Sequence, residues 1–461
     1  MAFCSLLAYA THYPVSKTAL RLIETVRPRL CCPAFLARHR SHPQAFTRRR
    51  QLTFARVMLF ILQKGIRSLQ GRLMDFFERL AAEGEPLEPV TAGAWSQARA
   101  KLRHTAFIEL NEEAVLASFY HPENEQQVRR WRGHRLCAID SSLLQLPESE
   151  ALGQHFGWEA TANGRGPCTV RHVQARVSVY YDLLNDLALD ARLEPGRRAE
   201  RALGALHVGA VRPGDVVITD RGYCGLEWFG RVRGAGADFV CRVPRRWHPA
   251  ADALFAAHEV GVSRTVELEP KGRLRRLLRQ AGFTQAVLQV RLVSLQLATG
   301  ELEVLATSLL DEAAYPTHAF GEVYGWRWGV ETFYGVLKGR LEVEHFTGQS
   351  LEAVRQDFFS SVFLSNVESV LSAPAQQELS AGDVHRRYAA QVNRAQSFHA
   401  LKSQALELFY REGPAEEILA ELTRLMQLAP VAQRPQRVAP RRASSLCRSL
   451  HYQRYKKKHI F

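Results

Sequence analysis

The sequence predicts an α/β protein in which a helical N-terminal region precedes a sheet that carries acidic residues. RLCAIDSSLLQLP is an apolar strand that carries Asp140, and GDVVITDRGYCG contains a buried strand that ends at Asp220, before a turn with Gly222. YGWRWGVETFYGVLK has the periodicity of a helix. With 461 residues, 46% hydrophobic and 23% charged, the chain has the size and composition of a folded protein of two or three domains.

The region before Asp140 is predicted to be helical. TFARVMLFILQKGIRSLQGRLMDFFERLAAE places apolar residues at helical spacing on both sides of Gly65, which indicates two helices or one broken helix. Thr91 is expected to cap a helix through AWSQARAKL, and Thr105 to cap AFIELNEEAVLASF. Four residues between these caps are candidate DNA contacts of a helix-turn-helix, with a solvated basic helix face as the alternative: Gln97, Arg99, Lys101 and Arg103.

Further strands are expected on both sides of Asp220. Between Asp140 and Asp220 there is room for two strands and a helix, in HVQARVSVYYDLL, LALDARLE and AERALGALHVGAV. After the strand ADFVCRVP, alternating runs in RTVELE, AVLQVRLVSLQL and ELEVLATSLL indicate additional strands. The stretch from Asp220 to Glu331 is longer than one helix and one strand require, so we expect a β-rich insertion over residues 245–318.

The helical stretch YGWRWGVETFYGVLK places four polar side chains within about one 60° arc of a helix surface: Tyr324, Arg327, Glu331 and Lys338. A phenol, a guanidinium, a carboxylate and an ammonium on one face suit a site that holds a metal beside phosphates. An exposed face with a salt bridge between neighbouring turns is the alternative.

Asp140, Asp220 and Glu331 are the candidate metal ligands and catalytic residues. A carboxylate in an apolar setting is costly unless it is paired or protonated, and a divalent cation removes that cost. Hard oxygen ligands suit Mg²⁺ or Mn²⁺ better than Zn²⁺.

Together these motifs resemble the DDE transposases of bacterial insertion sequences, specifically the insertion-sequence-four group. The signature of that group, Tyr-x2-Arg-x3-Glu-x6-Lys, is met in full by Tyr324, Arg327, Glu331 and Lys338. The resemblance also covers IDSS at Asp140, TDRGY at Asp220 and the downstream segment LEVEHFTGQSLEAVRQDFFSS.

The resemblance implies an RNase H-like catalytic core interrupted by a β-rich insertion. The chain is then expected to contain five parts: a helical N-terminal DNA-binding region (1–130), the first part of the core (131–244), the insertion (245–318), the second part of the core with the signature helix (319–410), and a C-terminal helical and basic tail (411–461).

The implied reaction is two-metal phosphoryl transfer on DNA, with two Mg²⁺ or Mn²⁺ ions held by the three acids. Arg327 and Lys338 would hold phosphates, and Tyr324 would hydrogen-bond one of them. Trp328, and more weakly Trp247, are candidates for stacking on a distorted end base, with packing in the core as the alternative for both.

The charge balance indicates a nucleic-acid partner. Lys and Arg number 61 against 46 acids, which gives a net charge of +15 and a pI near 9.7. The tract FTRRRQ at Phe46 to Gln51 and the tail from Arg434 are candidate contacts to the DNA backbone, or merely solubilising segments. The expected partners are double-stranded DNA, the terminal inverted repeats of the protein's own element and target DNA; the resemblance implies a homodimer on paired ends.

A reducing compartment is expected, because the eight cysteines include no CxxC pair. MAFCSLLAYATHYP lacks a basic n-region, and no run approaches the roughly 18 apolar residues of a membrane helix. We therefore expect a cytoplasmic bacterial protein, associated with the nucleoid when it acts, without a membrane partner.

The sequence alone leaves two other functions open. A decayed transposase would bind DNA ends without cutting them. A glycosidase would use Asp140 and Glu331 as an acid/base pair and would need no metal.

Overall fold

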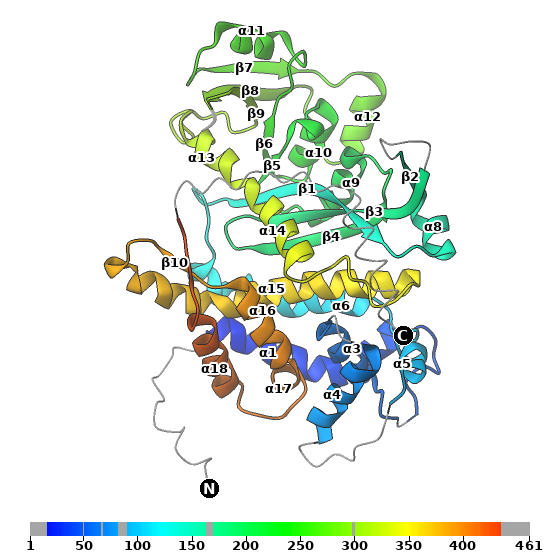
Figure 1. Cartoon of the computed structure of the whole chain (residues 1–461). Coiled ribbons are helices and arrows are strands. Elements are labelled where there is room, and N and C mark those ends of the chain that lie inside the picture. Colours follow the sequence, from blue (N-terminus) through cyan, green and yellow to red (C-terminus); the bar gives the residue numbers. More distant parts are fainter. Residues whose placement is uncertain are drawn as a thin grey trace. The chain divides into compact units, whose positions relative to one another are not determined.

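The computed structural model describes residues 16–48, 50–65, 68–81, 90–162, 169–296 and 300–434. The chain forms two compact units (Figure 1). The first, called the helical unit, consists of Met1–Gln126, Gln145–Gly153 and Leu337–Phe461; the second, called the sheet unit, consists of Gln127–Leu144 and Gln154–Val336. Beyond Arg434, the basic tail that the sequence offers as a DNA contact lies outside the described residues.

The sheet unit is built on one mixed sheet of nine strands, ordered β2-β3-β1-β5-β6-β9-β8-β7, with β4 paired to β3. The strands are β1 (Arg135–Leu146), β2 (Trp158–Ala162), β3 (Thr169–Asp182), β4 (Leu187–Pro195), β5 (Asp215–Thr219), β6 (Asp238–Arg242), β7 (Ser263–Leu268), β8 (Leu288–Gln296) and β9 (Leu302–Thr307). At the centre, β1, β5 and β6 run parallel. The α/β class expected from the sequence is confirmed.

A buried ion pair sets the register of the two central strands. Arg135 donates from Nε and Nη2 to the two carboxylate oxygens of Asp215 at 2.8 and 2.7 Å, and the Tyr180 hydroxyl donates to the same carboxylate at 2.6 Å. Arg135 and Asp215 face each other across the parallel ladder. Asp140 follows Arg135 by the same number of residues as Asp220 follows Asp215. Both aspartates therefore reach the same edge of the parallel ladder.

Residues 245–318 contain the three predicted strands, but they continue the main sheet because β9 pairs antiparallel with β6. The same segment holds two helices that the sequence analysis does not anticipate, α11 (Pro249–Ala257) and α12 (Gly272–Gln280). The end of α10 (Leu226–Gly234) meets the end of α12 backbone to backbone. A Cβ on Gly234 would lie 2.2 Å from the Ala281 carbonyl oxygen, so only glycine fits there.

The remaining helices of the sheet unit pack along the strands: α9 (Glu200–His207) lies on β3 and β4, α10 on β6, and α13 (Ala319–Trp326) on β8. The next helix, α14 (Trp328–Gly339), begins in the sheet unit and ends in the helical unit. Its Phe333 ring lies 4.8 Å from the Tyr181 ring of β3.

The helical unit surrounds one long helix, α15 (Leu351–Ala381). Most of its side chains are buried, and α1, α3, α6, α16 and α18 pack against it. The other helices are α1 (Lys17–Cys31), α2 (Pro33–His39), α3 (Phe54–Leu62), α4 (Leu69–Ala81), α5 (Ala92–Arg99), α6 (Thr105–Leu110), α7 (Ala117–Phe119), α16 (Arg394–Ser403), α17 (Ala405–Phe409) and α18 (Ala415–Gln427), and α8 (Glu150–Phe156) crosses the unit boundary. A short strand pair, β10 (Ala390–Gln391) and β11 (Val431–Ala432), lies near its C-terminal end.

Most of the local predictions for the N-terminal helices are confirmed. α3 and α4 lie on either side of Gly65, and the Thr91 hydroxyl accepts from the Ala94 N–H at 3.1 Å, which caps α5. The predicted Thr105 cap is wrong. Thr105 is itself the first residue of α6, and its hydroxyl bonds to His39 Nδ1 at 2.8 Å.

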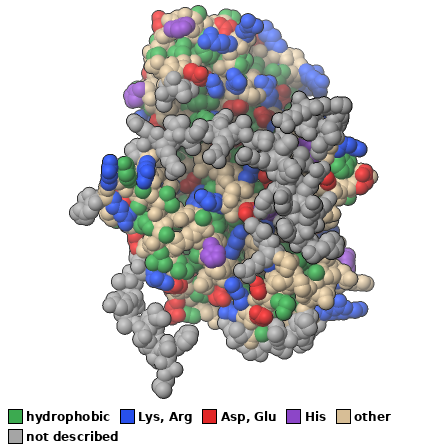
Figure 2. Space-filling model, in the orientation of Figure 1, with side chains coloured by type: hydrophobic (Ala, Val, Ile, Leu, Met, Phe, Trp, Pro, Cys, Tyr) green, Lys and Arg blue, Asp and Glu red, His purple; other side chains and the backbone are tan. Residues whose placement is uncertain are grey.

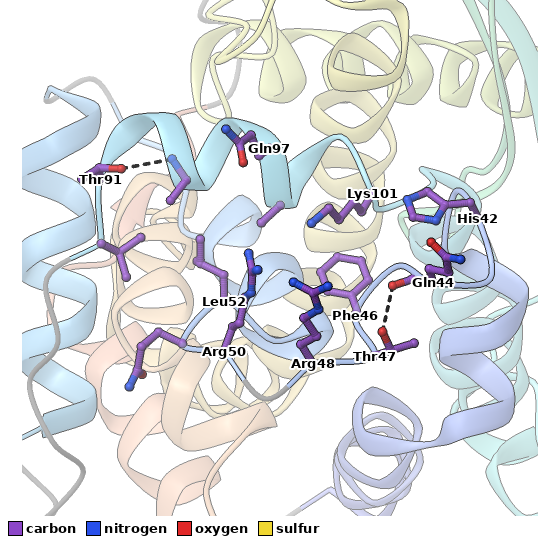
Figure 3. Close-up of a pocket in the computed structure, with 14 residues that line it drawn as sticks. His42, Gln44, Phe46, Thr47, Arg48, Arg50, Leu52, Thr91, Gln97 and Lys101 are labelled. Carbon is purple, nitrogen blue, oxygen red and sulfur yellow. Dashed lines mark hydrogen bonds between the residues drawn. The ribbon is translucent and has the colours of Figure 1, made fainter.

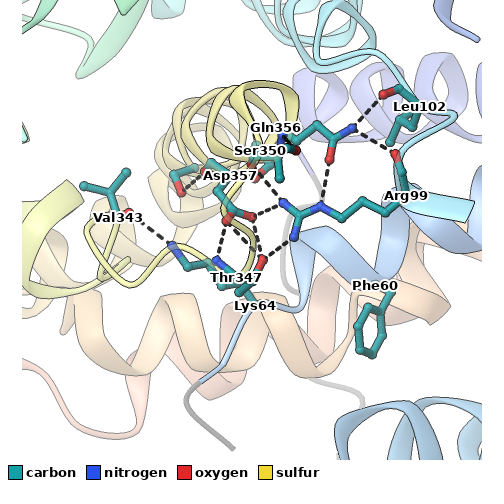
Figure 4. Close-up of polar contacts among 12 residues, drawn as sticks. Phe60, Lys64, Arg99, Leu102, Val343, Thr347, Ser350, Gln356 and Asp357 are labelled. Carbon is teal, nitrogen blue, oxygen red and sulfur yellow. Dashed lines mark hydrogen bonds and ion pairs between the residues drawn. The ribbon is translucent and has the colours of Figure 1, made fainter. Parts of the chain in front are cut away.

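The prediction of Arg99 as a DNA contact is also wrong. Arg99 is 5% exposed, and its guanidinium pairs with the buried Asp357 of α15 at 2.8 Å (Figure 4). Gln356 and Thr347 accept two further hydrogen bonds from it. Its charge therefore anchors α5 to α15.

Candidate active site

Asp140 lies in β1, and its backbone is held from two sides. Its carbonyl oxygen accepts from the Tyr334 hydroxyl of α14 at 2.8 Å and from Ser178 Oγ of β3 at 3.2 Å. Its carboxylate accepts from the Ser141 N–H at 2.8 Å. These bonds fix Asp140 between a strand and a helix that are far apart in sequence.

Asp220 follows the last residue of β5 and caps the short 3₁₀ turn Arg221–Tyr223. Its carboxylate accepts from the Gly222 N–H at 2.9 Å. A Cβ on Gly222 would lie 3.0 Å from that carboxylate oxygen and 3.4 Å from Glu200 Oε2, so glycine lets the chain pass close to both acids. The Asp-Arg-Gly sequence is thus explained by the local turn.

The stretch that the sequence predicts as one helix is divided at Arg327 into α13 and α14. Arg327 keeps helical torsion angles, and its neighbours still face it. Its guanidinium lies 5.6 Å from the centre of the Tyr324 ring and donates to Glu331 Oε1 at 3.0 Å. The predicted grouping of these three side chains is therefore present across the break.

Arg327 also connects the helix to the sheet, because its Nη1 lies 4.0 Å from Asp140 Oδ2. Burial raises the pKa of Asp140 to about 6, with Asp220 and Glu331 adding to the rise and Arg327 opposing it. Burial alone would lower the pKa of Arg327, but Tyr324, Glu331 and Asp140 raise it. Asp220 and Glu331 thus both contribute to the raised pKa of Asp140.

A fourth acid, which the sequence analysis does not identify, lies beside this site. Glu200 Oε1 accepts from Ser141 Oγ at 2.9 Å and from Arg176 Nη1 at 2.7 Å. Glu200 is the first residue of α9. Only its three-dimensional proximity to the IDSS segment and to the Gly222 turn identifies it as part of the site. Sequence spacing carries no signal for it.

Behind Asp140 lies a buried chain of Ser178, His207 and Asp190. His207 is fully buried and bonds to Asp190 Oδ2 at 2.8 Å and to Ser178 Oγ at 2.9 Å, and Ser178 in turn bonds to the Asp140 carbonyl. The residue types are those of a hydrolase triad, but burial denies a substrate access to Ser178. This chain supports β1 instead.

The other predicted site residues differ in exposure. Tyr324 is 4% exposed and burial raises its pKa to about 12, so it packs against Arg327 as a neutral phenol. Trp328 is 51% exposed, which rules out the core alternative, and Arg327 lies 5.4 Å from its ring. Trp247 is half-buried with its ring against Phe229. Lys338 lies in the part of α14 that belongs to the helical unit, and burial lowers its pKa.

The donor chemistry suits a divalent cation, although the three acids are not closed into a binding site. Within the described residues no group of three or more His, Cys, Asp or Glu side chains is arranged to hold a metal ion. Arg327 contacts Glu331 and approaches Asp140, and it supplies their countercharge. The buried Tyr223 hydroxyl, which lies near Asp140, Asp220 and Glu200, has no hydrogen-bond partner in the described structure. This unsatisfied hydroxyl and the nearby carboxylates of Asp140, Asp220 and Glu200 form a polar site that suits an additional bound ligand.

A mixed sheet that presents two aspartates from its central strands, with an arginine and a glutamate on an adjoining helix, has the features of a nuclease or transferase that acts on phosphodiesters. The chain belongs to the transposase DDE domain family, whose family model matches residues 131–367. It is a DDE transposase, an enzyme of DNA transposition.

The relatives agree with this family. Over 290 residues the chain is 24% identical to y4zB of Sinorhizobium fredii, which is named as a transposase; the match covers 61% of this chain and 72% of that protein. Over 109 residues it is 26% and 25% identical to the transposases for insertion sequence elements IS231B and IS231E of Bacillus thuringiensis, 24% of this chain and 21% of each relative.

Among solved structures, the piggyBac transposase synaptic complex with hairpin DNA aligns with 95% of this chain and 82% of its own. The TM-score is 0.39 at 11% identity, which is too low to establish a common fold. No helix in the described parts of the chain is long and apolar enough to cross a membrane.

Proposed function

We propose that this transposase catalyses metal-dependent cleavage and strand transfer at the ends of an insertion sequence, which is cut-and-paste transposition. The observation that carries the proposal is geometric: Arg327 lies 3.0 Å from Glu331 and 4.0 Å from Asp140, while Asp140 and Asp220 reach the same edge of the paired strands β1 and β5. The pKa of Asp140 is raised mainly by burial, with smaller contributions from Asp220 and Glu331. Clustered carboxylates with a raised pKa are typical of sites that function with a cation.

Asp140, Asp220 and Glu331 would hold two Mg²⁺ or Mn²⁺ ions. When bound, the ions activate the attacking hydroxyl or water and stabilise the leaving oxygen. Arg327 donates to Glu331 Oε1 at 3.0 Å and would orient that carboxylate as a ligand, because carboxylates that bind metals commonly accept a hydrogen bond from a neighbouring side chain. Its guanidinium would also be placed to hold a phosphate.

Further assignments of group, core and residue roles rest on the signature residues Tyr324, Arg327, Glu331 and Lys338. We propose that the chain belongs to the insertion-sequence-four group, that β1 and β3 to β6 form an RNase H-like core, and that β7 to β9 belong to the β-rich insertion. Lys338 would hold a phosphate, Trp328 would stack on a distorted end base, and Tyr324 would position Arg327. The exposure of Trp328 and the burial of Tyr324 support these last two roles.

The proposed partners are the terminal inverted repeats of its own element and target DNA, bound by a homodimer on paired ends. The net charge of +15 supports a polyanionic partner. A cytoplasmic bacterial enzyme that reaches the nucleoid fits this substrate.

Substitution of the three acids tests the proposal. Asp140→Ala, Asp220→Ala and Glu331→Ala should each abolish nicking of end DNA while binding persists, because affinity comes mainly from Lys and Arg contacts to phosphate. A gel-shift and a nicking assay on the same preparations, with Mg²⁺ and with EDTA, measure both. Glu259→Ala, which removes an exposed carboxylate of the same unit, is the control.

The outcomes separate the alternatives. Near-normal nicking by any one of the three variants removes that residue from the site. Tight binding without nicking by the wild type identifies a decayed transposase, and metal-independent cleavage of sugars identifies a glycosidase.

A further inference from the structure

A groove of about 630 Å³ lies in the helical unit, outside the residues that the transposase family model matches. One wall is formed by described residues of the loop from His42 to Leu52, and the other by α5 and by Lys101, which lies two residues beyond the end of that helix (Figure 3). The described residues of the FTRRRQ tract therefore line one groove together with the α5 region, the other segment that the sequence offers as a DNA contact.

The two walls are tied together by backbone hydrogen bonds. The Ser41 N–H donates to the Lys101 carbonyl at 2.7 Å, and the Arg103 N–H donates to the His39 carbonyl at 2.8 Å. On its other side α5 is fixed by the buried Arg99–Asp357 pair. Because Arg99 points inward, Gln97 and Lys101, one helical turn apart, face the groove. The groove is therefore a built feature of the fold.

Among the described residues, no acidic side chain balances the positive charge of the groove. Arg48, Arg50 and Lys101 line it, and Figure 3 shows Arg48 and Arg50 pointing from the loop toward α5. None of the described lining residues is acidic, and within the described parts of the chain no hydrogen bond or ion pair engages these three side chains. By contrast, Figure 2 shows Lys and Arg side chains over much of the visible face with Asp and Glu among them.

The floor is partly apolar. Phe46 lies in the groove with a positive φ of 58°, and its ring is held edge-on by Phe54 with the centroids 5.5 Å apart. Three cations on two facing walls above such a floor match a chain of phosphates with its sugars better than one small anion.

We propose that this groove binds the phosphodiester backbone of duplex DNA, with Arg48, Arg50 and Lys101 on successive phosphates. The inference rests on the proposed action on DNA and adds a contact region for the DNA backbone within the helical unit. Lysine and arginine contacts of this kind raise affinity and its salt dependence without specifying sequence.

Salt-dependent binding of a short labelled duplex tests this proposal. Arg48→Gln, Arg50→Gln and Lys101→Gln should each lower the slope of log K against log salt by about 0.9, the value for one lost phosphate contact. Lys17→Gln and Arg387→Gln remove one exposed charge each from the same unit outside the groove and should leave the slope unchanged.

Equal slopes for the groove variants and the wild type would overturn the proposal, and so would equal losses in the two controls. A polyglutamate peptide is the competing probe: if the three variants weaken its binding and not that of the duplex, the occupant is an acidic protein segment. A salt slope unchanged in the groove variants refutes the groove, whereas nicking by Asp140→Ala refutes the proposed catalysis.

Discussion

At the scale of single residues, Asp140 shows most directly that the site costs stability. Its carboxyl has a pKa raised from 3.8 to about 6, mainly by burial. The folded protein therefore binds this proton more tightly than the unfolded chain does. The protonated Asp140 carboxyl therefore contributes to the free energy of unfolding below about pH 4, and this contribution is lost as the pH rises through about 6.

Asp140→Asn should remove this pH dependence. A shift of about two units corresponds to about 3 kcal/mol, so the variant should exceed the wild type in free energy of unfolding by up to that amount above pH 6. The difference should vanish below about pH 4. Urea unfolding in EDTA across this range measures it, with Glu259→Gln as an exposed control. Parallel curves for Asp140→Asn and the wild type would refute the raised pKa.

Asp140, Asp220 and Glu331 could be proposed from the sequence because each lies in a local pattern. An apolar strand before Asp140 and Asp220, and helical spacing before Glu331, can be recognised within about ten residues. Glu200 and Tyr334 were not predictable, because they approach Asp140 through tertiary packing. Thr105 fits the pattern of a helix cap, but its hydroxyl bonds to His39, 66 residues away in sequence.

At the scale of elements, the prediction that Arg99 contacts DNA was wrong for the same reason, a partner that is distant in sequence. Its partner Asp357 lies 258 residues further along the chain, so the sequence shows a basic helix face and conceals a buried pair. α12 escaped recognition for a related reason. Its sequence GRLRRLLRQ is strongly basic, and only Leu278 is buried. The other strands of the large sheet were predicted from their apolar patterns, whereas β2 was not anticipated.

The Arg99–Asp357 pair should control how firmly α5 is held. Arg99→Met leaves Asp357 buried with less compensation and should lower the free energy of unfolding by about 3–5 kcal/mol. Arg103→Met, an exposed neighbour, should change it by less than about 0.5 kcal/mol. Urea unfolding followed by far-UV circular dichroism compares the two. Equal effects would mean that the buried pair has no special role.

At the scale of the whole molecule, metal binding should appear as thermal stabilisation. Mg²⁺ or Mn²⁺ at about 100 times its dissociation constant should add roughly 2.7 kcal/mol to the free energy of unfolding and raise the melting temperature. The variant with Asp140, Asp220 and Glu331 all changed to Ala should not respond. It should melt above the metal-free wild type, because clustered like charges are gone. An equal response of both proteins to metal would show that these acids do not form the site.

The position of α15 in the chain has a consequence for protein synthesis. α1, α3 and α6 all pack on α15, whereas every strand of the large sheet is translated before it. On the ribosome, the faces of α1, α3 and α6 that pack on α15 stay without this partner until Leu351–Ala381 emerges. Because Asp357 of α15 anchors α5, this wall of the groove gains its anchor only after Asp140, Asp220 and Glu331 have been made. In a nascent chain, the proposed catalytic acids therefore precede the element that anchors the proposed DNA-binding groove.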